Sequence, residues 1–381
     1  MPTPALTILR IVAAAALAGW VWLTLFRGWF WRTGLRVPTA PDPAAWPSVT
    51  AVVPARDEAG ILPLTLPTLV DQDFPGPLRV VLVDDNSTDG TADLVASRWP
   101  GVTVVRPAEP PPGWTGKPWA LAAGVDAAGD VDYLLFSDAD IAHAPDSVRI
   151  LVAAAEGHGY ALVSQMARLR ARTGWERLVV PAFVFFFALL YPFRWSNRPG
   201  SRTAAAAGGC VLARRDALAR AGGIAAIGGA VIDDVALGRI VKRSGAATFL
   251  GFSGTVESVR PYPALSALWR MVSRSAYTQL GYSPAALVGT VAGLALMFWA
   301  PVVATVAGLV IGDPVAAGLG GAGWLLMAGV YAPMLRYYRL PVVGAFALPY
   351  TATLYLAMTV DSAVAYHRGR TTAWKGRSYR R

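Results

Sequence analysis

The sequence is poor in the residues that build disulfides and metal clusters. Its 381 residues include one cysteine, Cys210, which excludes an intrachain disulfide. This cysteine follows Gly208 and Gly209 in a run of small residues, which favours a buried structural thiol over a reactive one. The three histidines are scattered without a second ligand pattern, so no zinc site is expected.

Charge is also scarce, and it is unevenly distributed. Charged residues make up 15% of the chain, against about 25% in a typical soluble domain. The net charge of +10 would suit nucleic-acid binding, but its distribution makes that a minor alternative. The block from Asp42 to Glu257 holds 22 of the 24 acids and 19 of the 34 bases, whereas the rest holds 15 bases and 2 acids. The basic excess therefore lies beside apolar runs, as the positive-inside rule describes.

Long apolar runs near both ends predict membrane segments. Ile11 to Phe26 is followed by arginines and bulky tryptophans, not by a small-residue cleavage site. Residues 1–36 are therefore predicted to be an uncleaved anchor whose C-terminal end is cytoplasmic. Residues 284–366 form a predicted transmembrane region, because they contain three stretches each about long enough to cross roughly 30 Å of hydrocarbon. These stretches are Ala285–Val310, Val315–Leu335 and Val342–Val360.

Three crossings after a cytoplasmic domain raise a problem of parity. The tail from His367 to Arg381 has six bases and no acid, and three crossings would place it on the opposite side from the central domain. The positive-inside rule argues against this placement. Val342–Val360, which contains Pro349, is therefore our candidate for a re-entrant segment.

Between these ends, strand-like and helix-like segments alternate after a Pro/Ala-rich linker at residues 37–47. The alternation predicts an α/β domain over residues 48–260 with a mainly parallel sheet, where ligands bind at the carboxyl ends of the strands. The expected strands are Val49–Val53, Arg79–Val83, Val102–Val105 and Tyr133–Phe136, and the expected helices are Leu62–Val70, Thr91–Trp99, Trp119–Ala127 and Val235–Ser244.

Two segments suggest contact with a membrane surface. Leu178–Phe193 is apolar and aromatic but short for a crossing. A helix in the membrane interface is the preferred interpretation, and a buried core helix is the alternative. Residues 261–283 form a predicted amphipathic interface segment.

Charged side chains follow the first two predicted strands. The first strand runs into Arg56-Asp57-Glu58, and the second runs into Asp84-Asp85 and the turn Asn86–Gly90. A carboxylate at a strand end can accept a hydrogen bond from a nucleotide base or ribose, and an arginine one strand away can meet a phosphate. The alternative is that Asn86–Gly90 is only an Asx-type turn that opens a helix.

Two further carboxylate pairs occur in the domain. Asp138 and Asp140 follow an apolar strand, and both could face one Mg²⁺, which prefers carboxylates together with substrate phosphates. A solvated turn is the alternative. Asp233 and Asp234 are adjacent, so each can raise the pKa of the other and suit it for proton abstraction. They could equally be acids in the first turn of a helix, and both interpretations can hold together.

Taken together, these motifs resemble family 2 glycosyltransferases. The resemblance covers about Val49 to Gly281 and rests on Pro-Ala-Arg-Asp-Glu, Asp-Asp-Asn-Ser-Thr-Asp-Gly-Thr, Asp-Ala-Asp and Asp-Asp in this order. The segment from Pro110 to Ala120 and the tail Trp374-Lys375-Gly376-Arg377 look like the membrane-bound, lipid-acting branch, most of all hopanoid-associated glycosyltransferases.

The resemblance implies a GT-A fold and an inverting transfer from a nucleotide sugar, with a UDP-sugar as the expected donor. In that comparison Asp234 matches the general base beside Asp233, and Asp140 matches the ligand of Mg²⁺ or Mn²⁺ on the diphosphate. Asp138 would lie near the ribose or sugar, and Asp85 would hold the base. The other expected donor-binding residues are Pro54, Arg56, Glu58 and Lys117.

One family signature is not intact. The Gln/Arg-x-x-Arg-Trp motif of processive members is missing, although Arg270 and Arg274 stand one helical turn apart nearby. These arginines could meet the leaving group or face lipid phosphates, and Trp374 and Arg377 are grouped with them as weaker candidates.

The expected protein is therefore a multi-pass enzyme of the inner membrane with a cytoplasmic GT-A domain. It would transfer a sugar from a nucleotide donor to a lipid such as a hopanoid, without nucleic acid or an obligate protein partner. The alternatives are a processive polysaccharide synthase and a non-catalytic nucleotide-binding membrane protein.

Overall fold

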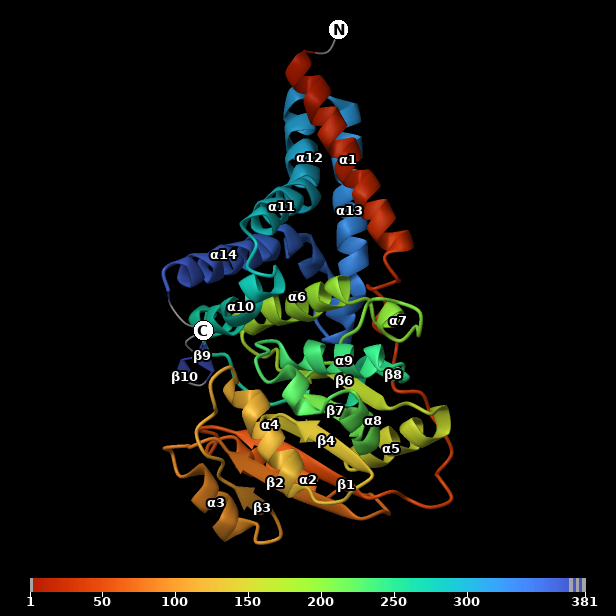
Figure 1. Cartoon of the computed structure of the whole chain (residues 1–381). Helices are drawn as coiled ribbons and strands as arrows, with labels where there is room; N and C mark the ends of the chain where they lie inside the picture. Colours follow the sequence, from red (N-terminus) through yellow and green to blue (C-terminus); the bar gives the residue numbers. More distant parts are fainter. Residues whose placement is uncertain (1–2, 370–372, 375–376, 379–381) are drawn as a thin grey trace. The chain divides into compact units, whose positions relative to one another are not determined.

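A computed structural model describes residues 3–369, 373–374 and 377–378 of the chain (Figure 1). The chain divides into two compact units. The sheet unit comprises residues 34–170, 193–261 and 371–381, and the helical unit comprises residues 1–33, 171–192 and 262–370. The predicted anchor and transmembrane region fall in the helical unit.

The sheet unit is built on one eight-stranded sheet. Strands β1 to β4 pair in parallel, as predicted. The other half of the sheet is mixed. There β6 and β8 pair in parallel, whereas β7 runs antiparallel to both its neighbours and β5 runs antiparallel to β8, so the expected mainly parallel arrangement does not extend to this half. The order is β3 (Thr103–Val105), β2 (Leu78–Asp84), β1 (Val49–Ala55), β4 (Tyr133–Ser137), β7 (Cys210–Arg214), β6 (Leu162–Leu169), β8 (Thr248–Ser258), β5 (Ile141–His143).

The direction of β7 matters for the site. β7 starts beside the carboxyl end of β4, because Cys210 pairs with Ser137. The small-residue run before β7 therefore lies next to the acids that follow β4, and Asp138 N–H donates to the Gly209 carbonyl at 3.3 Å. Cys210 is buried, which confirms the structural thiol predicted for it.

Alternating side chains of the strands form one core on each face of the sheet. In β1, Ala51 and Val53 belong to one core and Val52 to the other. This period of two is what a strand buried on both faces requires. The helices and helical turns of the unit are α2 (Leu62–Val70), α3 (Thr91–Arg98), α4 (Gly116–Ala127), α5 (Ser147–His158), α7 (Phe193–Ser196), α8 (Arg215–Arg220), η1 (Ile224–Ile227) and α9 (Asp233–Arg243).

The helical unit contains the apolar runs. By length and composition, four described segments could cross a membrane: Pro4–Phe26, Pro284–Ile311, Pro314–Tyr337 and Val342–His367. Large apolar side chains are exposed along them, among them Ile8, Trp22, Leu309, Val310 and Leu325. The elements are α1 (Pro4–Phe26), α6 (Gly174–Leu190), α10 (Leu265–Gln279), α11 (Pro284–Leu294), η2 (Ala295–Trp299), α12 (Ala300–Ile311), α13 (Pro314–Tyr337), η3 (Val342–Ala347) and α14 (Leu348–His367).

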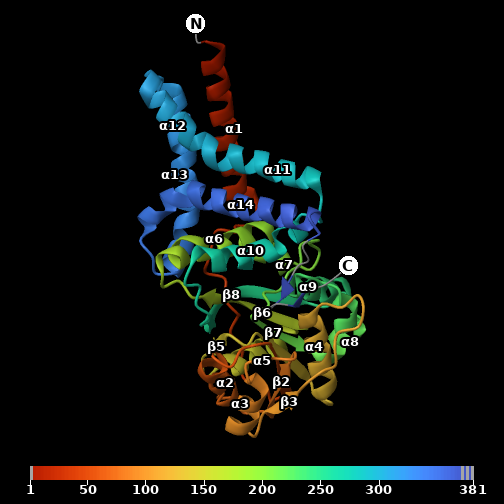
Figure 2. The same cartoon turned by 90° about the vertical axis from the view of Figure 1, so that its left-hand side faces the viewer.

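The run Pro284–Ile311 is not one straight helix. A π-helical turn, η2, joins α11 to α12, and Pro301 stands in the first turn of α12. Figures 1 and 2 show that α11 and α14 run across the direction of α1, α12 and α13. π-turns and prolines are two of the known causes of such bends. Pro349 lies in the first turn of α14 and does not interrupt it.

Helix α6 differs from the segment predicted at Leu178–Phe193. It begins earlier, at Gly174, where Thr173 and Glu176 form a capping box, and it ends at Leu190. Eight of its 17 residues are buried, including Val180, Phe185 and Ala188. This burial favours the core-helix alternative, and residues 171–192 belong to the helical unit, outside the sheet domain assigned to 48–260.

Candidate functional site

The loops that follow β1 and β2 are tied to each other by hydrogen bonds. Arg56 donates from Nη1 to the Asp85 carbonyl at 2.6 Å, and Asp85 N–H donates to the Ala55 carbonyl at 2.8 Å. The Asp85 side chain is fully buried, and its Oδ2 lies 3.5 Å from Arg56. The predicted donor-binding residues Arg56 and Asp85 are therefore brought together as an ion pair.

Asp57 shapes this pair of loops, although sequence reasoning gave it no role of its own. Its backbone is left-handed, with φ of 51°, and its Oδ1 accepts from Thr88 N–H at 2.8 Å. In the other direction, Thr91 Oγ1 accepts from Glu58 N–H at 2.9 Å. The polar turn Asn86–Gly90 thus opens α3, as its interpretation as an Asx-type turn predicts. It also positions the loop after β1, which that interpretation did not include.

Glu58 and Asp140 share one cation, Arg260. The Arg260 guanidinium donates to Glu58 Oε1 at 2.6 Å, and its Nε lies 3.3 Å from Asp140 Oδ2. Ser258 Oγ also donates to Asp140 Oδ2. Sequence reasoning missed Arg260, because a single arginine after a strand carries no signal until β8 is placed beside β5.

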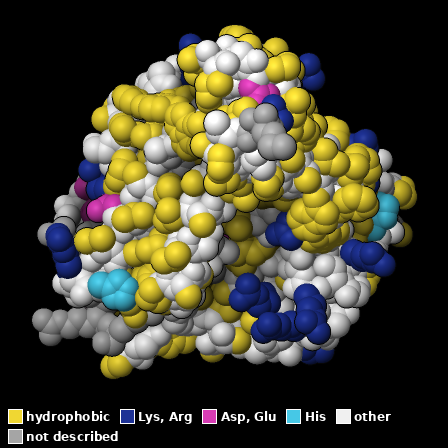
Figure 3. All heavy atoms as spheres, turned by 90° about the horizontal axis from the view of Figure 1, so that it is seen from above, with side chains coloured by type: hydrophobic (Ala, Val, Ile, Leu, Met, Phe, Trp, Pro, Cys, Tyr) yellow, Lys and Arg dark blue, Asp and Glu magenta, His cyan; other side chains and the backbone are white. Residues whose placement is uncertain are grey.

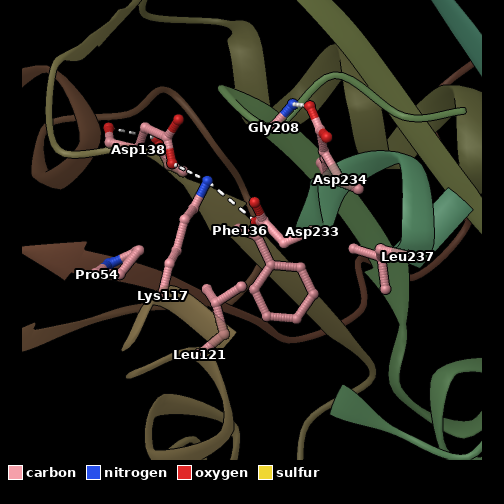
Figure 4. Close-up of a pocket in the computed structure, with 11 residues that line it drawn as sticks. Pro54, Lys117, Leu121, Phe136, Asp138, Gly208, Asp233, Asp234 and Leu237 are labelled. Carbon is pink, nitrogen blue, oxygen red and sulfur yellow. Dashed lines mark hydrogen bonds and ion pairs between the residues drawn. The ribbon is translucent and has the colours of Figure 1, made fainter. Parts of the chain in front are cut away.

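Lys117 joins two of the other predicted carboxylates (Figure 4). Its Nζ lies 2.7 Å from Asp138 Oδ1 and 3.2 Å from Asp233 Oδ2. Asp138 follows β4, Lys117 lies in the first turn of α4, and Asp233 begins α9. A pocket here is lined by these residues together with Pro54, Leu121, Phe136, Ser137, Gly208, Val211, Asp234 and Leu237.

Asp234 lies beside this ion pair and is held by backbone groups. Its Oδ2 accepts from Gly208 N–H at 2.8 Å, and its Oδ1 accepts from Val235 N–H at 2.7 Å. Asp233 and Asp234 form the first turn of α9, where the helix dipole favours negative charge. The prediction that both acids lie in the first turn of a helix is therefore confirmed. That position is compatible with a role of the pair in proton abstraction, which stays a prediction.

The segment before Lys117 is tied to the segment before Asp233. Thr115 N–H donates to the Gly228 carbonyl at 2.8 Å, and Thr115 Oγ1 donates to the Ala230 carbonyl at 2.9 Å. The Trp114 ring covers Gly228, where an added Cβ would lie 2.8 Å from it. The Pro/Gly/Trp-rich segment thus holds together the ends of α4 and α9 that carry the charged cluster.

Burial and neighbouring charges shift the pKa values of the cluster. Burial, reinforced by Asp233, raises the pKa of Asp234 to about 6. Burial also raises the pKa of Asp138, with Lys117 opposing the shift and Asp140 adding to it. Burial alone would lower the pKa of Lys117, but the carboxylates of Asp138 and Asp233 outweigh it and hold the pKa above its ordinary value. Lys117 is therefore charged, and Asp234 is a stronger base than an ordinary aspartate.

The donor chemistry of Asp138 and Asp140 fits a magnesium or manganese ion that is completed by substrate. Among the residues the structure describes, no three Asp, Glu, His or Cys side chains gather into a group that could hold a metal by themselves. Mg²⁺ commonly uses one or two carboxylates and takes its other ligands from phosphates and water. Both contacts of Asp140 are made by Oδ2, so its Oδ1 can still accept a ligand.

The weaker candidates from the sequence lie elsewhere. Arg270 and Arg274 are exposed on α10 in the helical unit. The backbone of Trp374 and Arg377 forms a short antiparallel pair, β9 (Ala373–Trp374) with β10 (Arg377–Ser378), and their side chains lie outside what the structure describes. The roles suggested for these four residues stay predictions.

Comparison with known proteins found one matching family model and several solved structures of similar fold. Residues 50–222 match the family model "Glycosyl transferase family 2". The mannosyltransferase PcManGT from Pyrobaculum calidifontis, solved with GDP-Man and Mn²⁺, is 21% identical, with a TM-score of 0.59 over 95% of this chain and 99% of that one. No curated protein sequence matches the chain.

Two other solved structures are similar over a smaller share of the chain. Glucosyl-3-phosphoglycerate synthase from Mycobacterium tuberculosis, solved with Mn²⁺, UDP and glucosyl-3-phosphoglycerate, is 24% identical over 62% of this chain and 80% of that one, with a TM-score of 0.41. Mannosyl-3-phosphoglycerate synthase from Rubrobacter xylanophilus is 19% identical over 62% and 73%, with a TM-score of 0.39. The fold is thus a GT-A-like α/β fold with a mixed sheet, accompanied by apolar helices near both ends.

Proposed function

We propose that this chain, which carries a family 2 glycosyltransferase domain over residues 50–222, transfers a sugar from a nucleotide-sugar donor to the hydroxyl group of a membrane lipid. The observation that carries the proposal is the charged cluster of Lys117, Asp138, Asp233 and Asp234 at the carboxyl ends of the strands. Ligands of α/β sheets bind at this edge. The same chain has four segments apolar enough to cross a membrane, which supports a lipid acceptor.

The proposed reaction is a single displacement. The acceptor oxygen forms a bond to the anomeric carbon as the bond to the nucleoside diphosphate breaks, and Asp234 takes the proton of the acceptor hydroxyl. A carboxylate whose pKa is raised to about 6 suits this task, because it is still ionised at neutral pH and holds a proton better than an ordinary aspartate. Asp233 stays paired with Lys117 beside the base.

The donor would lie across the loops after β1, β2 and β4. Arg56, Glu58 and Asp85 would bind the nucleoside, Pro54 would line its pocket, and Lys117 would meet the diphosphate. Lys117 suits this role because an ammonium group is a compact charge for phosphate.

Asp138 and Asp140 would hold Mg²⁺ or Mn²⁺. When bound, such an ion neutralises the charge that develops on the departing diphosphate. The named structures solved with Mn²⁺ support a divalent metal, but they do not favour Mn²⁺ over Mg²⁺ for this chain.

The membrane arrangement that we propose has α1 and α13 crossing the bilayer, α12 entering it beside α13 as the last part of the candidate segment Pro284–Ile311, and α14 lying along its surface. Figures 1 and 2 support it, because α14 runs across the other three helices. Helices α12 and α13 would enter and leave on the same side. The basic tail would then lie on the same side as the sheet unit, in the cytoplasm, as the positive-inside rule requires. A hopanoid is our first choice of acceptor, on the resemblance of the Pro-Pro-Gly-Trp-Thr-Gly-Lys segment.

The test is transfer by the purified full chain in liposomes of bacterial lipid extract, with radiolabelled UDP-glucose and GDP-mannose offered separately and Mg²⁺ or Mn²⁺ present. We expect a labelled lipid with one donor. Asp234→Asn should abolish its formation while donor binding by calorimetry is kept, and Asp93→Asn, a change at an exposed acid of α3, should leave both unchanged. Normal turnover by the Asp234→Asn variant would refute the assignment of the base. Donor hydrolysis without any glycosylated lipid would refute the lipid acceptor.

A further inference from the structure

A strongly basic surface lies on the sheet unit, formed by arginines to which the proposed reaction gives no role. Residues 193–209 and 235–256 together contain five arginines and one lysine but no aspartate or glutamate. All five arginines are exposed, whereas the lysine is half-buried. We call these five residues the arginine surface: Arg194, Arg198, Arg202, Arg239 and Arg243.

The two segments are held together by polar contacts. Lys242 Nζ, on α9, donates to the carbonyls of Trp195 at 3.2 Å, Ser196 at 2.6 Å and Thr203 at 2.7 Å. Asn197 exchanges two hydrogen bonds with the backbone of Leu250 in β8, at 3.0 and 2.7 Å. Lys242, the sixth basic residue, thus binds backbone carbonyls of residues 195–203. These hydrogen bonds hold the segment 193–209, with its three arginines, next to α9, which carries the other two.

The charge of this surface is not balanced by acids. Among the described residues, no carboxylate forms an ion pair with any of its five arginines, in contrast to Arg56, Arg106, Arg149 and Arg260 of the same unit. Arg239 and Arg243 are one helical turn apart on α9, so like charges lie side by side there, which destabilises an isolated helix. Figure 3 shows Lys and Arg side chains gathered on a face with few acidic ones.

We propose that the arginine surface binds the phosphate-bearing headgroups of an anionic bilayer, as a membrane contact separate from the apolar helices. Guanidinium groups donate two parallel hydrogen bonds to a phosphate and are weakly hydrated, which suits them to this ligand. Clusters of four to eight basic residues are typical of binding to anionic lipids. The four candidate membrane segments of the chain favour a bilayer over nucleic acid as the source of phosphate.

The test uses the full chain in nanodiscs and a label beside the surface. Cys210 is buried, so a cysteine introduced by Gly200→Cys can be labelled selectively. Gly200 is exposed, and a Cβ there meets nothing within 4 Å. Energy transfer from this label to a headgroup-labelled lipid is measured in phosphatidylcholine alone and with phosphatidylglycerol added to about 30 mol%.

We expect transfer to rise with phosphatidylglycerol and the rise to vanish in about 0.5 M salt, because screening shortens the range of the attraction. The triple variant Arg198→Gln, Arg202→Gln and Arg243→Gln should require at least about threefold more phosphatidylglycerol for the same signal. The matched control Arg79→Gln, Arg98→Gln and Arg220→Gln removes the same charge from exposed arginines elsewhere on the sheet unit and should behave like the parent.

Three results would overturn the proposal. The first is energy transfer that does not depend on phosphatidylglycerol. The second is an equal loss of energy transfer in both triple variants. The third is an equal rise in energy transfer when inorganic phosphate is added at constant ionic strength to nanodiscs of phosphatidylcholine alone. The last result would show a site for free phosphate. Sugar transfer is not measured, so the outcome does not depend on the proposed function.

Discussion

Gly208 and Asp234 lie so close together that even a methyl group on the glycine would press against the carboxylate. The Gly208 N–H donates to Asp234 Oδ2 at 2.8 Å. A Cβ on Gly208 would lie 3.3 Å from that same oxygen and 3.3 Å from Lys117 Nζ. One backbone position thus touches both the proposed base and the cation proposed to meet the diphosphate.

Gly208→Ala should therefore lower activity with little effect on folding. The neighbours must give way by a few tenths of an ångström, and small misplacements of reacting groups are costly, so we expect kcat to fall on the order of tenfold. Steady-state kinetics with the preferred donor measures this, and Gly101→Ala, at a site with nothing within 4 Å, serves as the control. Equal kinetics for the two variants would show that this close contact does not matter for turnover.

The rate should depend on the ionisation of Asp234. Because burial and Asp233 raise its pKa to about 6, the carboxylate is protonated below this pH and cannot accept a proton. We expect kcat/KM to rise with pH through about 6 and to level off above it. A profile of kcat/KM from pH 5 to 8, at constant ionic strength, measures this. A flat profile, or one with its midpoint near pH 4, would contradict the raised pKa.

Arg260 should matter for donor binding through Glu58 and Asp140. Arg260→Gln removes the positive charge between these two carboxylates and leaves the buried Glu58 beside a second acid. Because Arg260 is partly exposed, we expect a stability loss of only about 1–3 kcal/mol, together with weaker donor binding. Thermal unfolding and calorimetry measure the two effects. As a control, Arg168→Gln breaks an exposed ion pair with Glu257 and should change neither stability nor donor binding. Restoration of donor binding by Arg260→Lys would show that the positive charge of residue 260 is what matters.

Gly238 allows α9 to lie against the chain before β7. A Cβ at this position would come within 2.6 Å of the Ala205 backbone, which a flexible side chain cannot relieve. Gly238→Ala should therefore shift α9, and with it Asp233 and Asp234, at a cost of about 1–3 kcal/mol in stability. Denaturant unfolding of the detergent-solubilised chain measures the loss. An unchanged midpoint would mean that α9 can move without cost.

Much of the local structure could be predicted from the sequence. Leu62–Val70 is a helix with the predicted bounds, and the strands at Val49 and Tyr133 begin where they were expected. Such segments are readable because the pattern of apolar residues reports burial at short range. The positions of the acids were readable for the same reason, since each cluster follows directly after an apolar strand or begins a helix.

The pairings within the site depend on contacts that are distant in the sequence. The separation of Lys117 from Asp233 and of Arg260 from Glu58 exceeds 100 residues in each case, and neither pair has a local signal. Both follow from the placement of β7 and β8 in the sheet, including the antiparallel direction of β7. Only packing decides that direction, because a strand buried on both faces shows the same apolar pattern whichever way it runs.

The sequence by itself determined that this chain joins an α/β domain with acids at its strand ends to apolar segments rich enough for a membrane. The tertiary structure decided which acid meets which cation, and that α6 packs with the apolar helices. It also decided that the two segments carrying five exposed arginines lie next to each other. The physical reason is that apolar periodicity is a local property of the chain, whereas ion pairs and surfaces arise where distant segments are brought together.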